Sequence, residues 1–269
     1  MCVSAARFWR FALALCFLSF ANGLRADVVE HSGPILTDTT WRSTDEHLIV
    51  GDVTVYSQVT LTIEAGTTVR VAAGSDSTAG GNDTQRSELI VNGSLLVQGT
   101  ADQPVLITSN ATTPAANDWG GIRFNSRFPF VLRHAVIEYG SVGVDYRVSG
   151  AVSASVAIED SVVRYSTGNG VYLQTNSGAT LAALVRNNTL HNHSGSGLAL
   201  ANSSSNSTLA ATVSGNLVYA STGVSLSNGG TLSGTRLTAN EIRNNSGNGL
   251  SVYNYTSSST AIQMAYAKR

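Results

Sequence analysis

Residues 161–173 read SVVRYSTGNGVYL, and residues 188–200 read NTLHNHSGSGLAL. The same kind of stretch returns as NLVYASTGVSL at 216–226 and as NEIRNNSGNGLSV at 240–252. Each stretch begins at a polar residue and contains, near its end, a Gly that is followed by alternating apolar residues. A motif that returns at a nearly fixed period indicates a repeat architecture, in which each coil repeats one local structure.

The Gly-aliphatic step sets the period, because its glycines are 27, 27, 26 and 26 residues apart. These glycines are Gly143, Gly170, Gly197, Gly223 and Gly249. A second large apolar residue follows each aliphatic residue two positions later, at Tyr146, Leu173, Leu200, Leu226 and Val252. Alternation with period two predicts a strand that buries one face.

Three further columns precede the glycines. Two are apolar and are expected to face inward: Val131, Ile158, Val185, Val213 and Leu237, and then Val136, Val163, Leu190, Val218 and Ile242. The column between them is polar and contains His134, Ser161, Asn188, Asn216 and Asn240. Asn tolerates a left-handed backbone, and stacked Asn amides can bond to each other. We therefore expect the three Asn to adopt left-handed or bridge conformations in an asparagine ladder at a sharp corner.

A third strand begins at each Thr-Leu pair, at 180–181, 208–209 and 231–232. Three strands per coil, with no helical periodicity, predict an all-β chain. The expected fold is a single-stranded right-handed parallel β-helix, a three-sided solenoid with about 26 residues per coil and about 4.8 Å between coils.

The N-terminal half carries similar strands at a less regular spacing. They are expected at 48–50, 53–55, 61–63, 69–71, 89–91, 95–97 and 105–107. Residues 75–86 and 112–118 break the pattern and are expected to form excursion loops. We assign residues 24–47 to an N-terminal cap and residues 48–269 to the β-helix, which is incomplete at its C-terminal end if the chain is part of a longer β-helix.

The first 23 residues have the features of a signal peptide. Arg7 and Arg10 precede the apolar run 11–20, which is too short to span a bilayer, and 21–23 (ANG) or 24–26 (LRA) offers a cleavage site. A short membrane anchor or a lipidated Cys16 is the alternative. Both cysteines, Cys2 and Cys16, lie in this segment, so the mature chain has no disulfide. The prediction is a secreted protein, extracellular, at the cell surface or periplasmic.

The charge balance excludes some partners. Without Arg7 and Arg10, 14 basic residues remain against 17 acidic ones, a net charge of −3, or −4 if Arg25 is also removed. This mild acidity argues against nucleic acid as a partner. No second apolar segment is long enough to span a membrane.

Four stretches of the N-terminal half carry a family resemblance. They read VTLTIEAGTTVRV (59–71), SELIVNGSLLVQGTADQPVLITS (87–109), DWGGIRF (118–124) and HAVIEYG (134–140). They resemble the opening coils of bacterial secreted right-handed parallel β-helix proteins of the pectin-lyase-like group. The resemblance implies the fold, but the group includes lyases, hydrolases, tailspikes and adhesins, so it does not imply one function.

The resemblance also implies where chemistry would lie, over the sheet that starts at the Gly-aliphatic step. Outward residues there are Asp145, Arg147, Tyr172, Gln174, Ala199, Ala201, Ser225, Ser227, Ser251 and Tyr253. One acid among ten residues cannot supply the carboxylates of a calcium site. The Asp-Asp pair and Gly-His-Gly of the related hydrolases are also missing. We assign no catalytic residue, cofactor or metal site to the chain.

A ligand face remains as the candidate site. Tyr172 and Tyr253 could stack on sugar rings beside Asp145, Arg147 and Gln174. A second stripe, consisting of Arg164, His191, Tyr219 and Arg243, shares one register and could bind a sugar or an anion.

Two pairings offer structural explanations for the remaining polar residues. We expect Arg133 to pair with Asp160, or Arg186 with Glu159, across coils. His191 and His193 could bind a metal from one strand face, but without a third ligand we interpret them as turn residues in solvent.

The predicted function is a non-catalytic β-helix interaction module, with a polysaccharide or cell-surface glycan as its candidate partner. The alternative is a polysaccharide lyase or hydrolase, which would need a groove containing two carboxylates and a base. Asp83, Asp102 and Asp118 of the irregular half are untested candidates for such a groove. An uncapped last coil, ending at Lys268-Arg269, also predicts end-to-end self-association or a longer β-helix.

Overall fold

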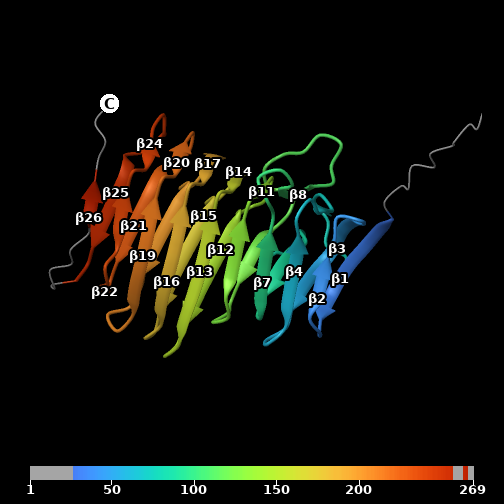
Figure 1. Cartoon of the computed structure of the whole chain (residues 1–269), viewed down its shortest axis with the longest axis horizontal. Coiled ribbons are helices and arrows are strands. Elements are labelled where there is room, and N and C mark those ends of the chain that lie inside the picture. The colour runs from blue at the N-terminus through green and yellow to red at the C-terminus, as the bar shows by residue number, and fades with distance from the viewer. Residues whose placement is uncertain (1–26, 257–262, 266–269) are drawn as a thin grey trace, which may run out of the picture.

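The computed structural model describes residues 27–256 and 263–265, and the predicted signal peptide lies outside the described residues. Figure 1 shows an elongated stack of strands that runs from the N-terminal coils to the C-terminal coils. Every strand pair is parallel, so each strand bonds to its copies in the neighbouring coils. The chain is a parallel β-helix with three faces, which we call sheets A, B and C in the order in which a coil visits them.

Sheet A starts at the Gly-aliphatic step. It contains the end of β3 (Glu46–Val55), β6 (Glu88–Val91), β9 (Gly121–Phe124), β12 (Val144–Ser149), β15 (Val171–Asn176), β18 (Leu198–Asn202), β21 (Gly223–Asn228) and β25 (Gly249–Asn254).

Sheet B follows it in each coil. It contains β2 (Thr39–Trp41), β4 (Thr60–Glu64), β7 (Ser94–Gln98), β10 (Phe130–Arg133), β13 (Ser153–Glu159), β16 (Thr180–Arg186), β19 (Thr208–Ser214), β22 (Thr231–Leu232), β23 (Arg236–Thr238) and β26 (Gln263–Ala265).

Sheet C completes the coil and is continuous with sheet A through the long strand β3. It contains β1 (Val28–Ile35), the start of β3, β5 (Thr68–Val71), β8 (Val105–Ser109), β11 (Ala135–Glu138), β14 (Val162–Ser166), β17 (Thr189–His193), β20 (Leu217–Tyr219) and β24 (Glu241–Ile242). Strands β1 and β2 lie within the region predicted to be a cap, so parallel pairing begins before residue 48. Residues 75–86 and 112–118 form no strands, as predicted.

One inward row of sheet B confirms most of the predicted register. Ile158, Val185, Val213 and Leu237 pair in order and are buried. The prediction that Val131 faces inward was wrong. Leu132 pairs with Ile158 and is fully buried, while Val131 is partly exposed. A shift of one residue moves a side chain to the other face of a strand, so this coil was misread between 131 and 136, while its Gly143 and Tyr146 align as predicted.

The same shift changes the next strand and the corner of that coil. Ile137, not Val136, pairs with the inward Val163, and Ala135 takes the position expected for His134.

Hydrogen bonds at the corner run from coil to coil. The Asn216 Oδ1 accepts from the Asn188 backbone N–H (2.9 Å) and from its Nδ2 (3.0 Å). The Asn216 Nδ2 donates to Val185 O and to Asn240 Oδ1.

The left-handed residue of this corner is not the Asn but the residue before it. Positive φ angles occur at His134, Asp160, Asn187, Gly215 and Ala239. The Asn188, Asn216 and Asn240 side chains point inward from the following position, which explains why Asn188 and Asn216 are only 1% exposed.

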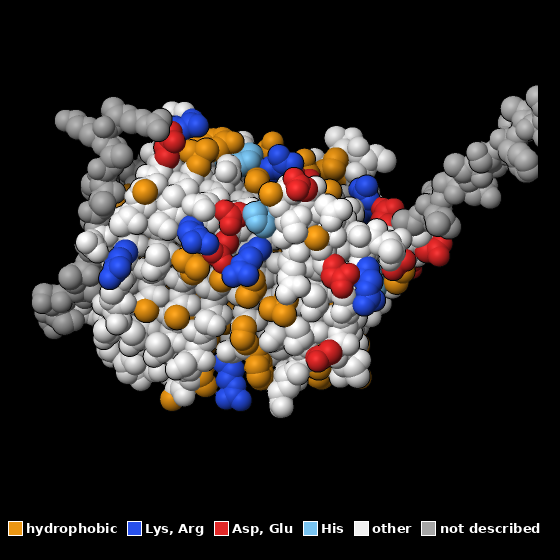
Figure 2. Space-filling view, viewed as in Figure 1, with side chains coloured by type: hydrophobic (Ala, Val, Ile, Leu, Met, Phe, Trp, Pro, Cys, Tyr) orange, Lys and Arg blue, Asp and Glu red, His pale blue; other side chains and the backbone are white. Residues whose placement is uncertain are grey.

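Charged side chains are scarce, as Figure 2 shows for one face, where acidic and basic groups gather beside a histidine near the middle. On sheet B, Glu159 lies between two arginines: Arg133 Nε at 3.0 Å and Arg186 Nη2 at 2.5 Å. The predicted Arg186–Glu159 pair is confirmed. Arg133 contacts Glu159 instead of Asp160, again because of the one-residue shift.

Candidate functional site

Two carboxylates replace glycine at the start of sheet A. The strand register aligns Asp52 and Glu88 with the column that continues through the glycines of the Gly-aliphatic step. Those glycines are Gly121, Gly143, Gly170, Gly197, Gly223 and Gly249. The two acids are therefore neighbours on adjacent coils, although 36 residues separate them in the chain. Sequence analysis missed them, because the Gly column was not extended into the irregular half.

Loop 75–86 covers both acids. The Asp52 Oδ1 accepts from the Glu88 backbone N–H (2.8 Å), and the Glu88 Oε2 accepts from the Asn82 backbone N–H (2.7 Å). The Asp52 Oδ2 is buried and has no hydrogen-bond partner among the described residues. A Cβ on Gly81 would lie 2.3 Å from Glu88 Oε2 and 2.7 Å from Asp52 Oδ2, so this loop backbone approaches closely only because residue 81 is Gly.

Burial changes the ionisation of Asp52. It raises the pKa of this carboxyl to about 6, and the nearby Asp76 and Glu88 carboxylates add to the rise. The backbone N–H of Glu88, which donates to Asp52, opposes it. Asp52 therefore changes between its protonated and ionised forms at a pH close to neutral, unlike an exposed aspartate.

An alternating chain of charges continues from Glu88 toward the later coils. Arg123 pairs with Glu88 and, through Nη1, with Asp145 Oδ2 (3.1 Å). Arg147 binds Asp145 with two hydrogen bonds, Nε to Oδ1 (2.8 Å) and Nη2 to Oδ2 (3.0 Å). The Asp145 side chain is only 6% exposed, whereas that of Arg147 is 53% exposed. The surface of this network is therefore formed mainly by a guanidinium group.

A groove lies over this network. Two adjoining hollows of about 330 and 460 Å³ share Asn125 and Arg147 in their walls. The first is also lined by Asn82, Arg123, Phe124 and Asp145. The second is also lined by Ser126, Arg127, Val148, Ser149, Val152, Gln174 and Asn176. The groove follows β9, β12 and β15, and amide, hydroxyl and guanidinium groups lie in its walls beside apolar side chains.

The predicted ligand face is partly assembled here. Asp145 pairs with Tyr172 and Arg147 with Gln174 in register, and the Arg147 Cζ lies 5.0 Å from the Tyr172 ring centre. Tyr253 is separate: it pairs with Ser227 at the far end of sheet A and is 51% exposed.

The second predicted stripe lies on sheet C. Arg164, His191 and Tyr219 pair in register, and the Arg243 Cζ lies 5.4 Å from the Tyr219 ring centre. The His191 and Tyr219 rings are stacked at 4.7 Å. Both arginines have acidic partners, since Arg164 pairs with Glu138 (2.6 Å) and Arg243 with Glu241 (2.7 Å).

The interpretation of His191 and His193 as residues in solvent was wrong. They are 8% and 5% exposed. His193 Nε2 donates to Val163 O (3.0 Å), since a carbonyl can only accept, and burial lowers the pKa of His193 to about 4. Within residues 27–256 and 263–265, no group of three or more His, Cys, Asp or Glu side chains could hold a metal ion.

A second histidine pair was not expected. His31 Nε2 and His47 Nδ1 lie 2.9 Å apart at the N-terminal end of the stack, and both rings stack on Trp41. Burial, with His47 nearby, lowers the pKa of His31 to about 4, so the pair is neutral at physiological pH. The two residues share no sequence motif, because they are joined only by the pairing of β1 with β3.

The three acids left untested in sequence analysis do not line the groove. Asp83 pairs with Arg86 (2.8 Å), and Asp118 accepts from Ser109 Oγ (2.6 Å). Asp102 is exposed in a turn. Among the described residues, no helix is long and apolar enough to cross a membrane.

Comparison with known proteins finds a family model that matches part of the sequence and solved structures that are similar over most of the chain. The periplasmic alginate epimerase AlgG is similar in structure at 11% identity, over 89% of this chain and 76% of that chain, with a TM-score of 0.33. A double mutant of AlgG matches at 11% identity over 89% and 77%, also with a TM-score of 0.33. No curated protein sequence matches the chain. Residues 33–130 match the sequence model of the family described as pectate-lyase like beta helix domain, and the coils beyond residue 130 continue the same three-sheet pattern.

Proposed function

We propose that the chain is a non-catalytic interaction module that binds an acidic polysaccharide in the groove over β9, β12 and β15. The observation that carries this proposal is the exposed guanidinium of Arg147 above a buried Asp145, in a groove that also contains amide and hydroxyl side chains and Arg127. A non-catalytic module binds a polymer on its surface and places no free acid or base beside a glycosidic bond.

The charges of the groove favour an anionic ligand. The Asp145 carboxylate is already bound by Arg123 and Arg147, so it offers little to a cationic or neutral ligand. Arg127 lines the groove near Phe128, and no acidic partner lies within ion-pair distance of it in the described chain. Arginine binds carboxylates through two parallel hydrogen bonds, which suits a polymer of uronic acids. The Tyr172 ring, half-exposed beside Arg147, supplies a surface for a sugar ring.

The proposal includes export. Its support is the N-terminal sequence, in which two arginines precede the apolar run 11–20 and a small-residue cleavage site. Sequencing the N-terminus of the mature protein tests it, with a start at residue 24 or 27 as the expected result.

The binding test is a calorimetric titration with hexagalacturonate, using its fully methyl-esterified form as a neutral control of equal length. We expect binding of the acidic hexamer that weakens as salt rises, because ion pairs at the surface are screened. Arg147→Ala should weaken it at least about tenfold, and Arg127→Ala less. Arg236→Ala, which removes an exposed arginine from sheet B, is the matched control and should change nothing. Equal affinity of the two hexamers, or unchanged affinity in Arg147→Ala, would contradict the proposal.

A polysaccharide lyase or hydrolase is the second candidate, because the groove adjoins two carboxylates and arginines. Asp52, with its pKa near 6, could exchange a proton at neutral pH, and Glu88 lies beside Arg123. Both acids lie under loop 75–86, so this chemistry requires the loop to move. The test is release of shortened oligomers from polygalacturonate. Activity that Asp52→Asn and Glu88→Gln both abolish would favour the enzyme over the binding module.

A further inference from the structure

The corner of the coil between sheets C and A has a feature that the groove over β9, β12 and β15 does not explain. Consecutive coils pass through a left-handed residue there: Tyr139 (φ 67°), Tyr165 (φ 59°), Asn192 (φ 59°), Ala220 (φ 50°) and Asn244 (φ 52°). Asn accepts this conformation readily, whereas a bulky aromatic residue does so at a cost. The backbone therefore does not favour Tyr at 139 or 165, and a role for the two rings themselves would account for their presence.

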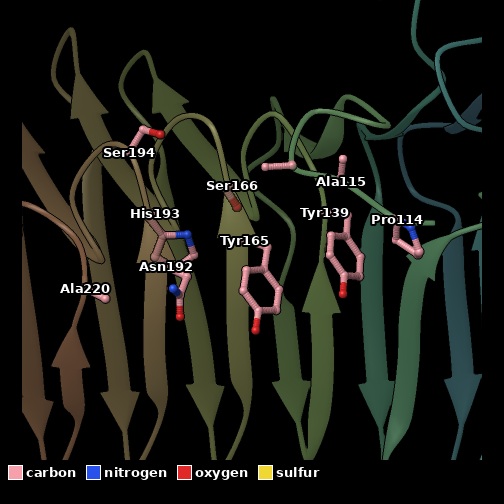
Figure 3. Close-up of a pocket in the computed structure, with 10 residues that line it drawn as sticks. Pro114, Ala115, Tyr139, Tyr165, Ser166, Asn192, His193, Ser194 and Ala220 are labelled. Atoms are coloured by element: carbon pink, nitrogen blue, oxygen red, sulfur yellow. The ribbon is translucent and has the colours of Figure 1, made fainter.

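The two rings stack on each other, and the Arg164 Cζ lies 5.4 Å from the Tyr165 ring centre. Their planes are 9° from parallel, and their centres are 5.2 Å apart, which is close to the spacing of neighbouring coils. Figure 3 shows both rings with their hydroxyl groups pointing the same way, with Asn192 beyond Tyr165 and Pro114 beyond Tyr139. No described residue forms a hydrogen bond with either hydroxyl group.

The rings border a shallow, open hollow of about 550 Å³. Pro114, Ala115 and Ala116 of the loop between β8 and β9 also line it, and Figure 3 shows Pro114 and Ala115 beside Tyr139. The lining therefore combines two aromatic rings with small apolar side chains. This arrangement suits a flat ligand that has an apolar face.

Polar groups without partners complete the hollow. The Asn192 Oδ1 accepts from His191 Nδ1 (2.5 Å), which leaves the Asn192 amide N–H groups free to donate. Ser166 Oγ and His193 Nδ1 are buried among the lining residues and have no hydrogen-bond partner in the described structure. These two atoms lie behind the surface of the hollow, so the polar groups that it offers to a ligand are the Asn192 amide and the two tyrosine hydroxyls.

No lining residue carries a formal charge at neutral pH, because burial lowers the pKa of His193 to about 4. The adjacent Arg164 is paired with Glu138 at 2.6 Å. A site without free charge, with an aromatic wall and unsatisfied hydroxyl and amide groups, favours a neutral ring that carries several hydroxyls. We propose that this hollow is a second binding site, for a neutral oligosaccharide, which packs against the Tyr139 and Tyr165 side chains and bonds to Asn192.

The test is a calorimetric titration of the mature chain with cellohexaose, xylohexaose, mannohexaose and maltohexaose. We expect at least one of these neutral oligomers to bind. Tyr139→Asn and Tyr165→Asn should each weaken that binding at least about tenfold, since each removes one stacking ring. Asn keeps the left-handed corner, so both variants should fold and melt at or above the wild-type temperature. Tyr56→Asn, which removes an exposed tyrosine elsewhere, should bind like the wild type.

The outcome also separates this site from the groove over β9, β12 and β15. Binding of hexagalacturonate should be unchanged in both tyrosine variants, and binding of the neutral oligomer should be unchanged in Arg147→Ala. The proposal is overturned if none of the four oligomers binds the wild-type chain, or if binding survives in the two tyrosine variants. A fall in melting temperature with retained binding would assign the rings to packing of the corner, which also overturns it.

Discussion

The first coils and the later coils use the same column of sheet A in opposite ways. In the later coils the column is glycine, and the neighbouring backbone fills the space where a side chain would be: a Cβ on Gly143 would lie 2.3 Å from Val163 Cγ1 and 2.4 Å from Gly170 O. In the first coils the column carries Asp52 and Glu88, and loop 75–86 covers them. At this column the later coils therefore serve close packing, while the two buried acids lie where the repeat is broken.

The largest effect is expected from breaking the regular half. Gly143→Ala places a methyl group against backbone, so we expect a loss of about 3 kcal/mol or more in unfolding free energy. Gly234→Ala is the control, because its surroundings are open and only its φ of 62° is unfavourable, which should cost about 1 kcal/mol. Urea denaturation of both variants measures the difference. Equal losses would show that Gly143 is not sterically required.

Removing the buried acid of the irregular half should come next. Glu88→Ala leaves the Asn82 N–H without a partner and removes one of the two acidic partners of Arg123, so it should cost about 3 kcal/mol. Because Glu88 holds loop 75–86, limited proteolysis should cut that loop faster in the variant. Glu241→Ala, whose exposed carboxylate pairs only with Arg243 among the described residues, should leave the loop resistant.

The corner of the later coils tests the scaffold by another route. Asn216→Val removes the amide that bonds to Asn188, Val185 and Asn240, and should cost about 2 kcal/mol. Asn240→Val, at a less buried position nearer the end of the stack, should cost less. Thermal melting of both variants measures the ranking, and a reversed order would contradict the role given to the buried column.

The smallest effect concerns the pH dependence of stability. The folded-state pKa of Asp52 is about 6, above its ordinary value of 3.8, so the folded state binds the proton more tightly than the unfolded state. Asp52 therefore lowers stability as pH rises from about 4 to above 6, by about 1 kcal/mol after allowance for solvent screening. Asp52→Asn should remove this loss. The comparison of melting temperatures from pH 4 to pH 8 cancels the opposite contributions of His31 and His193, which both forms retain.

The fold could be predicted from the sequence because the Gly-aliphatic step and the inward rows repeat with little variation. The errors in register have one physical cause: the coil with Val131 and His134 is shifted by one residue, and period-two alternation gives no internal check on such a shift. Asp145, Arg147, Tyr172 and Gln174 were predicted because they belong to regular coils. Asp52, Glu88 and Arg123 were missed because they lie where the spacing varies. Asp52 and Glu88 could have been found by their position, because each acidic residue directly precedes an inward aliphatic residue where the later coils have Gly.

Hydrogen exchange with and without hexagalacturonate tests the central claim most directly, because it locates the ligand on the coils. The groove on the early part of sheet A predicts protection in 120–127, 144–149 and 171–176, together with a change in loop 75–86. The later coils, from β18 onward, should exchange as in the free protein. Protection confined to residues 198–254, or no protection at ligand saturation, would contradict the assignment of the site to the groove over β9, β12 and β15.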